Sequence, residues 1–207
     1  MASLYFKYAA MNSGKSTQLL QAHYNYAERG MNPLALTAGI DVRSGKGFIS
    51  SRLGIRSAAD TFEKSTDIYA QIEALHRVKP VDAVFIDEAQ FMTRLQVFQC
   101  ARIVDALDIP VLCYGLKTDF MGKLFEGSEA LLCLADNIEE IKALCWCGRK
   151  ATMTARVAAD GQIVREGSQI AIGGNDMYTS LCRKHFMSGE AKMFVPPHSA
   201  EDSEKVA

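Results

Sequence analysis

The residues best suited to phosphate chemistry lie near the amino terminus, where the chain reads Gly14-Lys15-Ser16-Thr17. They fall between an expected strand and an expected helix, the setting of a P-loop, whose backbone N–H groups and helix N-terminus attract phosphate oxygens. Lys15 would add a full charge at the β- and γ-phosphates, and Ser16 a hydroxyl for Mg²⁺. Ala9 replaces the first glycine of the P-loop spacing, and a chance occurrence on a surface turn is the alternative. We expect ATP phosphates to contact Ala9, Ala10, Met11, Asn12, Ser13, Gly14, Lys15, Ser16 and Thr17.

Two carboxylates, Asp87 and Glu88, follow the apolar run 84–86. In a parallel sheet the carboxyl ends of the strands line the ligand crevice, so Asp87 is expected to reach a Mg²⁺ held at Ser16. Glu88 would point toward the group that accepts the phosphoryl. A solvated acidic pair at a strand end is the alternative. Together with the P-loop, the pair predicts an ATP-using phosphotransferase or hydrolase.

A second group of chemically capable residues lies far along the chain, as Cys145, Cys147, Cys182 and His185. Three thiolates and one imidazole satisfy tetrahedral Zn²⁺, and four protein ligands leave no open position, so we expect a structural zinc. Such a site can contribute on the order of 10 kcal/mol of apparent folding free energy. Unligated reduced thiols, with His185 on the surface, are the alternative. The remaining cysteines sit among apolar residues and are expected to be buried thiols: Cys100, Cys113 and Cys133.

The composition excludes several protein classes. The chain has 207 residues, 48% of them hydrophobic, and a net charge of -1, which argues against a dedicated nucleic-acid binder. It holds no run of 18 apolar residues, so no membrane-spanning helix is expected. The first residues lack the charged start and apolar stretch of a signal peptide. We therefore expect a cytoplasmic protein that folds without disulfides.

The elements that must position these groups alternate along the first two-thirds of the chain. Short apolar runs and amphipathic stretches of this kind predict a parallel sheet covered on both faces. The four glycines of residues 38–60 fit a mobile loop or a hairpin equally well. Strands are expected at 4–8, 34–37, 81–86 and 110–115, and helices at 15–29, 66–77 and 93–107.

The pattern changes near residue 140. Alternating residues at 152–157 and 162–165 flank Asp160-Gly161, which is a strong hairpin signal. The tail after residue 194 is polar and begins with prolines, so we expect it to be disordered. The predicted organisation is a P-loop domain at 1–141, a small zinc-binding β-rich domain at 142–194 and a tail at 195–207.

In this order, the motifs resemble the type II thymidine kinases, which join a RecA-like P-loop domain to a zinc-bound lasso. The resemblance spans about residues 3 to 190 and is closest to the bacterial branch, whose loop also reads Ala-Met-Asn. It is carried by Met11 with Ser13-Gly14-Lys15-Ser16-Thr17, Asp41-x-Arg43, Asp87-Glu88-Ala89-Gln90-Phe91, Tyr114-Gly115-Leu116-x-Thr118-Asp119-Phe120 with Gly122 and Phe125, and Ile172-Gly173-Gly174-x-x-x-Tyr178 before Cys182.

The resemblance implies roles for individual residues. Glu88 matches the general base that takes the proton of the thymidine 5′-hydroxyl, and Asp87 the carboxylate associated with Mg²⁺. Asp41 matches a residue that binds the deoxyribose 3′-hydroxyl. Arg43 matches a residue near the phosphates, and Gln90 is also expected among the residues that bind ATP and its phosphates. The fourth metal ligand varies between Cys and His in the family. The thymine surroundings correspond to Met11, Phe91, Phe120, Phe125 and Tyr178, with lasso backbone groups at Gln169, Ala171 and Gly173.

The chemistry of thymine agrees with this assignment. The base is neutral and flat, so it needs an apolar slot with a few fixed donors and acceptors. The aromatic residues near 91, 120 and 125 can supply the slot, although core packing is the alternative for each. A pocket for the methyl group is worth only about 1–3 kcal/mol, so deoxyuridine is expected to be a poorer substrate rather than a forbidden one.

We therefore expect transfer of the ATP γ-phosphoryl to the 5′-hydroxyl of thymidine, giving dTMP and ADP. The resemblance also implies a homotetramer and feedback inhibition by dTTP. One alternative is a nucleic-acid-stimulated ATPase of related fold, which the neutral charge and the lasso residues disfavour. Another is a non-enzymatic zinc module that binds nucleic acid, which would leave Asp87 and Glu88 unexplained.

Overall fold

The centre of the molecule is a six-stranded sheet in which every pairing is parallel. The computed structural model describes residues 1–41, 45–169 and 177–192. All the predicted strands of this region are present, and two short edge strands were not predicted. In order across the sheet, the strands are β5 (Asp60–Phe62), β2 (Pro33–Ala38), β6 (Ala83–Asp87), β7 (Val111–Leu116), β1 (Leu4–Ala9) and β8 (Asn137–Glu140).

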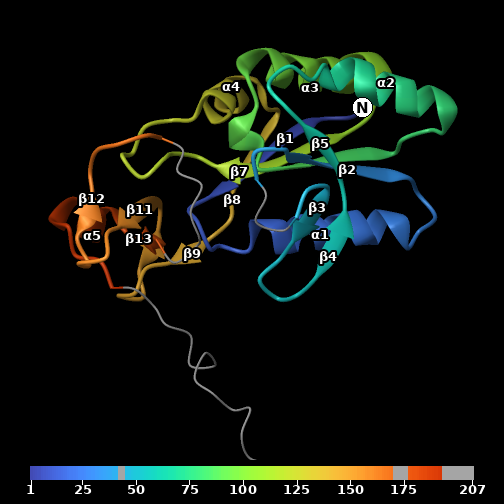
Figure 1. Ribbon diagram of the computed structural model, residues 1–207. Coiled ribbons are helices and arrows are strands. Elements are labelled where there is room, and N and C mark those ends of the chain that lie inside the picture. Colours follow the sequence, from blue (N-terminus) through green and yellow to red (C-terminus); the bar gives the residue numbers. More distant parts are fainter. Residues whose placement is uncertain (42–44, 170–176, 193–207) are drawn as a thin grey trace, which may run out of the picture.

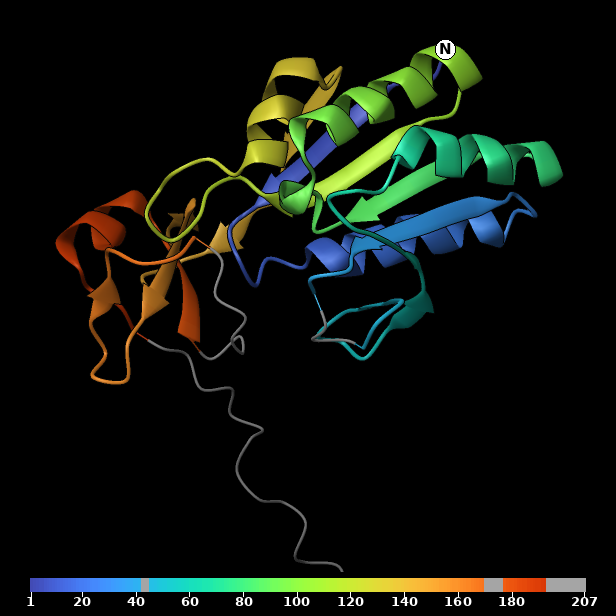
Figure 2. The same cartoon turned by 45° about the horizontal axis from the view of Figure 1, so that its top comes forward.

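Helices cover both faces of the sheet, as a parallel sheet requires. Figure 2 shows helices both below and above the sheet. The central strand β6 illustrates the arrangement, because Val84 and Ile86 join the cluster of the three upper helices whereas Phe85 packs with the lower one. The helices are α1 (Lys15–Ala27) on one face and α2 (Ile68–Val78), α3 (Arg94–Leu107) and α4 (Glu126–Leu134) on the other.

Side-chain caps fix where two of the upper helices begin. The carboxylate of Asp67 accepts a hydrogen bond from the Ala70 N–H at 3.0 Å, so α2 starts two residues later than the spacing predicts. Thr93 and Gln96 form a reciprocal capping box at the start of α3. Such caps satisfy backbone N–H groups that have no partner inside the helix.

The glycine-rich segment after β2 contains a hairpin. Its strands, β3 (Phe48–Ser50) and β4 (Arg56–Ala58), pair antiparallel beside α1 (Figure 1). Ile49 is buried in the same cluster as the apolar face of α1. The structure thus decides between the loop and the hairpin for the described part of residues 38–60.

A smaller group of elements, which we call the small lobe, follows the sheet. It holds the predicted hairpin around Asp160-Gly161, in which Val157 pairs with Ile163. Seven buried residues form a cluster of their own there, separate from the two clusters that lie on the faces of the sheet. We call the sheet, its covering helices and the β3–β4 hairpin the large lobe. The elements of the small lobe are β9 (Ala143–Leu144), β10 (Lys150–Ala151), β11 (Met153–Val157), β12 (Ile163–Val164), β13 (Tyr178–Leu181) and α5 (Arg183–Ser188).

Two of the three isolated cysteines are buried, as predicted, and the third is not. Cys100 and Cys113 lie in the core between sheet and helices, whereas Cys133 is exposed. The prediction for Cys133 was wrong because this residue lies on α4, where Ala130 and Leu131 face the core and Cys133 faces away from it.

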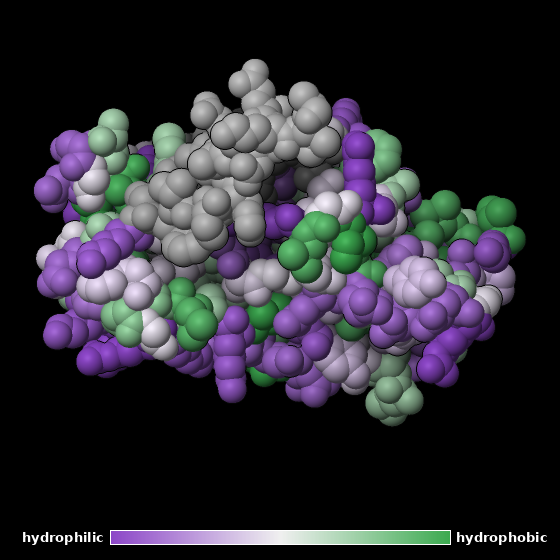
Figure 3. Space-filling view, turned by 90° about the horizontal axis from the view of Figure 1, so that it is seen from below, coloured by the Kyte–Doolittle hydropathy of each residue, from purple (hydrophilic) through white to green (hydrophobic). Residues whose placement is uncertain are grey.

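The sequence analysis predicts no membrane-spanning helix, and the described helices agree with this prediction. Within the described ranges, each helix is too short or too polar to cross a bilayer. Seen from below, hydrophilic side chains spread over the molecule and the hydrophobic ones form small groups among them (Figure 3). The expected tail at residues 195–207 lies outside the described residues.

Candidate active site and metal cluster

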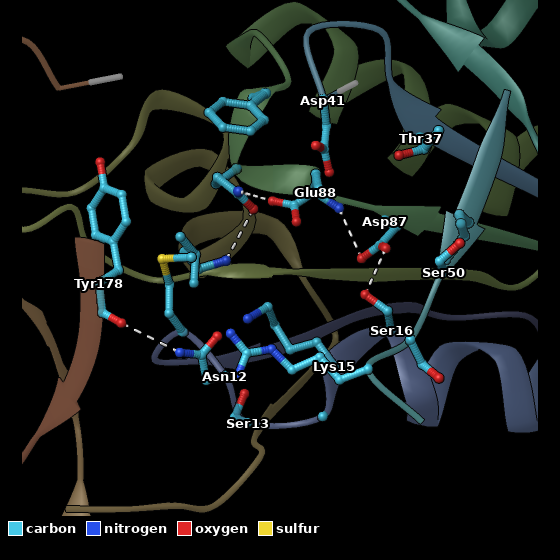
Figure 4. Close-up of a pocket in the computed structure, with 18 of the residues that line it drawn as sticks. Asn12, Ser13, Lys15, Ser16, Thr37, Asp41, Ser50, Asp87, Glu88 and Tyr178 are labelled. Atoms are coloured by element: carbon cyan, nitrogen blue, oxygen red, sulfur yellow. Dashed lines mark hydrogen bonds between the residues drawn. The ribbon is translucent and has the colours of Figure 1, made fainter. Parts of the chain in front are cut away.

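The carboxyl ends of β1, β2, β6 and β7 open into a cavity of about 840 Å³ (Figure 4). The small lobe closes one side of this cavity with residues of β11 and β13. Ligand sites of parallel sheets form at this edge, where loops replace the hydrogen-bonded strands. The residues from the predicted site that line it are Met11, Asn12, Ser13, Gly14, Lys15, Ser16, Thr17, Asp41, Asp87, Glu88, Gln90, Phe91, Phe120, Phe125, Gln169 and Tyr178.

The loop between β1 and α1 has the backbone that its residues predict. Gly14, directly before α1, has a φ of 82°, which disfavours any side chain. Asn12 has a φ of 60°, which asparagine tolerates better than most residues. Lys15 is buried, and its Nζ donates a hydrogen bond to the Ala10 carbonyl at 3.2 Å. Ala10 is itself buried, and it lies behind the cavity rather than on its wall, as does Ala9 at the end of β1.

Ser16 and Asp87 come together from α1 and β6, as the sequence predicts. The Ser16 hydroxyl donates to the Asp87 carboxylate at 2.9 Å. Burial raises the pKa of Asp87 to about 7, and the negative charge of Glu88 adds to this rise. The bond from Ser16 and the positive charge of Lys15 lower the pKa of Asp87. A carboxylate held in this way is stabilised by any further cation that reaches it.

A tight turn after β6 aims the second carboxylate. Glu88 has a φ of 53°, and its N–H donates to the Asp87 carboxylate at 3.0 Å. The side-chain amide of Gln90 donates to the Glu88 carboxylate and accepts from the Leu116 N–H at 3.0 Å. Gln90, which is 2% exposed, therefore ties Glu88 to the end of β7.

Two glycines leave room for this turn. A Cβ at Gly115 would lie 2.8 Å from the Gln90 Oε1 atom. A Cβ at Gly127, in α4, would lie 2.5 Å from the Ala89 carbonyl oxygen. Both distances are shorter than van der Waals contact, so only glycine allows these segments to approach the turn.

Aromatic side chains form the other end of the cavity. Phe91 and Phe125 meet edge to face with their centroids 5.9 Å apart. Phe120 is buried, and the Arg156 guanidinium lies 4.0 Å from its centroid while the Arg156 Nε donates to the Tyr178 hydroxyl at 3.1 Å. The aromatic residues thus pack in the core and line the cavity at once. Arg156, which contacts both Phe120 and Tyr178, was not predicted as a site residue.

Several other residues of the cavity were also missed. Thr37, the last residue but one of β2, pairs with Asp87, and the β3–β4 hairpin contributes residues from Phe48 to Leu53 to the wall. Figure 4 shows Thr37 and Ser50 flanking Asp87. Their positions depend on strand pairing and on the fold of the hairpin, for which the sequence carries no local motif. The predicted site residues Arg43, Ala171 and Gly173 lie outside the described residues.

Contacts between the lobes join the loop after β1 to the small lobe. The Met11 N–H donates to the Thr154 hydroxyl at 3.1 Å, and the Ser180 hydroxyl donates to the Met11 carbonyl. The Asn12 side chain donates to the Tyr178 carbonyl at 3.4 Å. Farther along the cavity, the amide of Gln169 donates to the Asp119 carboxylate at 3.0 Å. Thr154, Ser180 and Asp119 were not predicted as site residues.

The four predicted zinc ligands gather at one end of the small lobe. The ligand atoms of Cys145, Cys147, Cys182 and His185 all lie within 4.8 Å of one another. The His185 Nδ1 atom is 3.4 Å from the Cys145 Sγ and 3.6 Å from the Cys182 Sγ. Thiolates bound tetrahedrally to zinc at about 2.3 Å lie roughly 3.8 Å apart, so this donor set fits the ion.

One residue beside the cluster was missed. Trp146 stacks on the His185 ring with centroids 4.2 Å apart and an angle of 11° between the planes. The other ring nitrogen of His185 lies 3.9 Å from the Glu190 carboxylate. Stacking and the carboxylate both orient the imidazole so that Nδ1 faces the three sulfur atoms.

Several bacterial proteins are similar to this chain over most of its length. The thymidine kinase of Jannaschia sp. (strain CCS1) is 58% identical over 186 residues, covering 90% of this chain and 95% of that protein. The thymidine kinase of Agrobacterium fabrum is 54% identical over 187 residues, covering 90% and 97%, and that of Vibrio parahaemolyticus is 52% identical over 192 residues, covering 93% and 100%. Among solved structures, the Pif1 helicase from Candida albicans matches with a TM-score of only 0.38 at 17% identity, over 68% of this chain and 36% of that chain.

The family known as thymidine kinase matches residues 2–186, which is most of the chain. The match includes the loop after β1, the two carboxylates after β6 and all four residues of the metal cluster. With the identity to bacterial relatives, it confirms the resemblance that the motifs indicate. The chain belongs to the thymidine kinase family.

Proposed function

We propose that this enzyme transfers the γ-phosphoryl of ATP to the 5′-hydroxyl of thymidine, giving dTMP and ADP, and accepts deoxyuridine less well. The observation that carries the proposal is the layout of one cavity, with a P-loop and the Ser16–Asp87 pair at one end and an aromatic slot at the other. Glu88 lies between them, where an acceptor hydroxyl would meet the phosphate (Figure 4).

The phosphate end is built to hold negative charge. The backbone N–H groups after Ala9 and the N-terminus of α1 would bind phosphate oxygens, with Lys15 as the charged partner. Ser16 and Asp87 would hold the Mg²⁺ that accompanies ATP, and Arg43 would lie near the phosphates. Mg²⁺ held there would offset the negative charge that develops on the β- and γ-phosphate oxygens.

Glu88 is proposed as the general base that takes the proton of the 5′-hydroxyl. Its carboxylate must be fixed in direction to do this, and the Gln90 amide supplies that constraint. We therefore propose that Gln90 orients Glu88, a role in addition to the predicted place near the phosphates.

The nucleoside is proposed to occupy the aromatic end. Phe91, Phe120, Phe125 and Met11 would surround the flat faces of thymine, and Tyr178 would close the slot from the small lobe. Asp41 would bind the 3′-hydroxyl of the deoxyribose. Backbone groups at Gln169, Ala171 and Gly173 would meet the polar edge of the base.

The remaining parts of the proposal concern assembly and regulation. Zinc would be structural, held by the cluster of the small lobe, with domain limits near residues 141 and 194. A homotetramer and inhibition by dTTP at the combined phosphate and thymine sites follow from the family resemblance, and a cytoplasmic location is proposed beside them. Each stays a proposal for this chain.

The decisive experiment is a radiolabelled transfer assay with Mg-ATP and zinc-replete protein against thymidine, deoxyuridine, deoxycytidine, deoxyadenosine and deoxyguanosine. We expect label on thymidine, less on deoxyuridine and none on the other three. Lys15→Ala should abolish transfer and leave the zinc content unchanged. No label on any nucleoside would overturn the proposal, and ATP hydrolysis that requires DNA would favour the alternative ATPase.

A further inference from the structure

The peptide groups on either side of Met11 are held by a pair of hydroxyls from the small lobe. Thr154 on β11 and Ser180 on β13 are direct cross-strand partners, so their side chains point to the same face of the small sheet. On that face, Thr154 accepts from the Met11 N–H at 3.1 Å, and Ser180 donates to the Met11 carbonyl. One cross-strand pair thus satisfies both backbone groups of a single P-loop residue.

The next residue shows why the loop needs this support. Asn12 has a φ of 60°, a left-handed conformation that costs free energy in an L-residue. Its side chain donates to the Tyr178 carbonyl at 3.4 Å, which is a third bond from the loop to β13. Thr154 is 3% exposed, so a variant without its hydroxyl would put a buried apolar side chain where the Met11 N–H now meets its acceptor.

The inner side of the loop is held from elsewhere. The Ser13 hydroxyl and the Lys15 ammonium both donate to the Ala10 carbonyl, at 2.9 and 3.2 Å. These bonds hold the carbonyl of the peptide before Met11 from within the large lobe, whereas Thr154 holds the N–H of the same peptide from the small lobe. The peptide after Met11, whose orientation sets the direction of the following N–H groups, is held by Ser180 of the small lobe, and the Asn12 side chain adds its bond to the Tyr178 carbonyl.

We infer that Thr154 and Ser180 are positioning residues that couple the small lobe to phosphate binding by the P-loop. They touch the loop rather than the reacting atoms. Phosphate binding by a P-loop depends on the directions of its N–H groups, so a rotated Met11 peptide would weaken Mg-ATP binding. This inference rests on the proposed function in taking residues 9–17 as the ATP site.

The test measures the dissociation constant of Mg-ATP by calorimetry in the absence of thymidine. We expect Thr154→Val and Ser180→Ala each to weaken binding about fivefold, the usual worth of one hydrogen bond. The double variant should be little worse than either single variant, because both hydroxyls hold the same residue. Thr154→Ser and Ser180→Thr keep the hydroxyls and should bind ATP nearly as well as the wild type.

A neighbouring residue supplies the matched control. Thr179 lies next to Ser180 on β13 and pairs with Ala155, so its side chain points to the opposite face of the sheet. Thr179→Val should leave ATP affinity, zinc content and melting temperature unchanged. In steady state, Ser180→Ala should raise the KM for ATP and change kcat by less than twofold.

Three results would overturn the coupling: wild-type affinity in the double variant, equal weakening by Thr179→Val, or no recovery in the hydroxyl-retaining variants. If Thr154→Val does not fold, the half-buried position Ser180 carries the test alone. A wild type that binds Mg-ATP but phosphorylates no nucleoside would overturn the proposed function and leave the coupling intact.

Discussion

The two lobes contribute different kinds of groups to one cavity. Among the described residues of its wall, every charged side chain comes from the large lobe, including Lys15, Asp87 and Glu88. The small lobe supplies only the neutral residues Thr154, Gln169 and Tyr178. Charged groups keep a fixed geometry when they stand on a rigid sheet, whereas neutral contacts suit a neutral ligand. The difference indicates that chemistry belongs to the large lobe and that the small lobe shapes what binds.

The lobes also differ in what holds them together. The large lobe buries apolar residues on both faces of its sheet, in two clusters. The small lobe has one cluster of seven buried residues, and Cys145 and Cys182 are among them. Two of its core residues are therefore candidate zinc ligands. A core this small usually needs a metal or a disulfide, so the small lobe should depend on zinc and the large lobe should not.

The largest expected effect separates the lobes by this dependence. Cys182→Ser should abolish zinc binding and unfold the small lobe, because a structural zinc contributes on the order of 10 kcal/mol of apparent folding free energy. Trp146, the only tryptophan, stacks on His185, so its fluorescence reports on the small lobe alone. Helical circular dichroism, which comes mainly from the large lobe, should persist.

The exposed Cys133 on α4 provides the control for that variant. Cys133→Ser should keep the zinc content and the Trp146 fluorescence of the wild type. If Cys182→Ser instead retained normal fluorescence and a normal melting curve without metal, the small lobe would be stable on its own and the contrast between the lobes would fail.

The next effect tests whether chemistry belongs to the large lobe. Glu88→Gln keeps the size of the side chain and removes the base, so kcat should fall by about 10²–10⁴. That loss corresponds to about 3–5 kcal/mol of transition-state stabilisation. The dissociation constant of Mg-ATP should change little. Glu129→Gln, at an exposed site of α4, is the matched control, and near-normal turnover in Glu88→Gln would show that another group acts as the base.

A smaller effect is expected where the small lobe shapes binding. Tyr178→Phe removes the hydroxyl that accepts from Arg156, which should raise the KM for thymidine about threefold to tenfold. Steady-state kinetics should show kcat nearly unchanged, because the reacting groups stay in place. Tyr24→Phe on the exposed side of α1 is the control. A fall in kcat without a change in KM would place Tyr178 in the chemistry rather than in binding.

The smallest effect concerns the packing of the large lobe alone. Burial against the sheet lowers the pKa of His23, whose ring meets Phe85 at 5.6 Å between centroids. The folded protein therefore resists protonation of His23, so its stability should fall as the pH drops below about 6.5. Melting curves of His23→Gln should lose part of this acid sensitivity and match the wild type in pH dependence near pH 8. Identical acid sensitivity in both proteins would contradict the prediction.

Most of the sheet could be predicted because its central strands are continuous apolar runs. Helix α4 was missed because its second and third residues are Gly127 and Ser128, which are weak helix formers. Gly127 is required there by the close approach of the Ala89 carbonyl, so a tertiary contact overrides the local preference. The edge strands β5 and β8 were missed because they are short and carry polar residues such as Asp60 and Glu139, as sheet edges often do.

The site residues likewise fall into two groups, those that belong to short sequence motifs and those whose partners lie far away in the sequence. The P-loop, the Asp87–Glu88 pair and the metal ligands lie in short motifs, and the structure brings each set together. Thr154, Ser180 and Arg156 were missed because their partners lie in other segments. No local pattern marks a threonine whose hydroxyl meets a backbone group 143 residues away.

The bonds to Met11 also have a consequence for the timing of synthesis. The loop that would bind ATP leaves the ribosome well before its partner Ser180, which lies 169 residues later in the chain. At about 5–20 residues per second, the interval between them is roughly 10–30 s. During this interval the parallel sheet can begin to form, but the loop lacks the contacts that orient it. A nascent chain that has displayed its whole P-loop is therefore still an incomplete nucleotide site, and translation has to pass Ser180 before the loop is set.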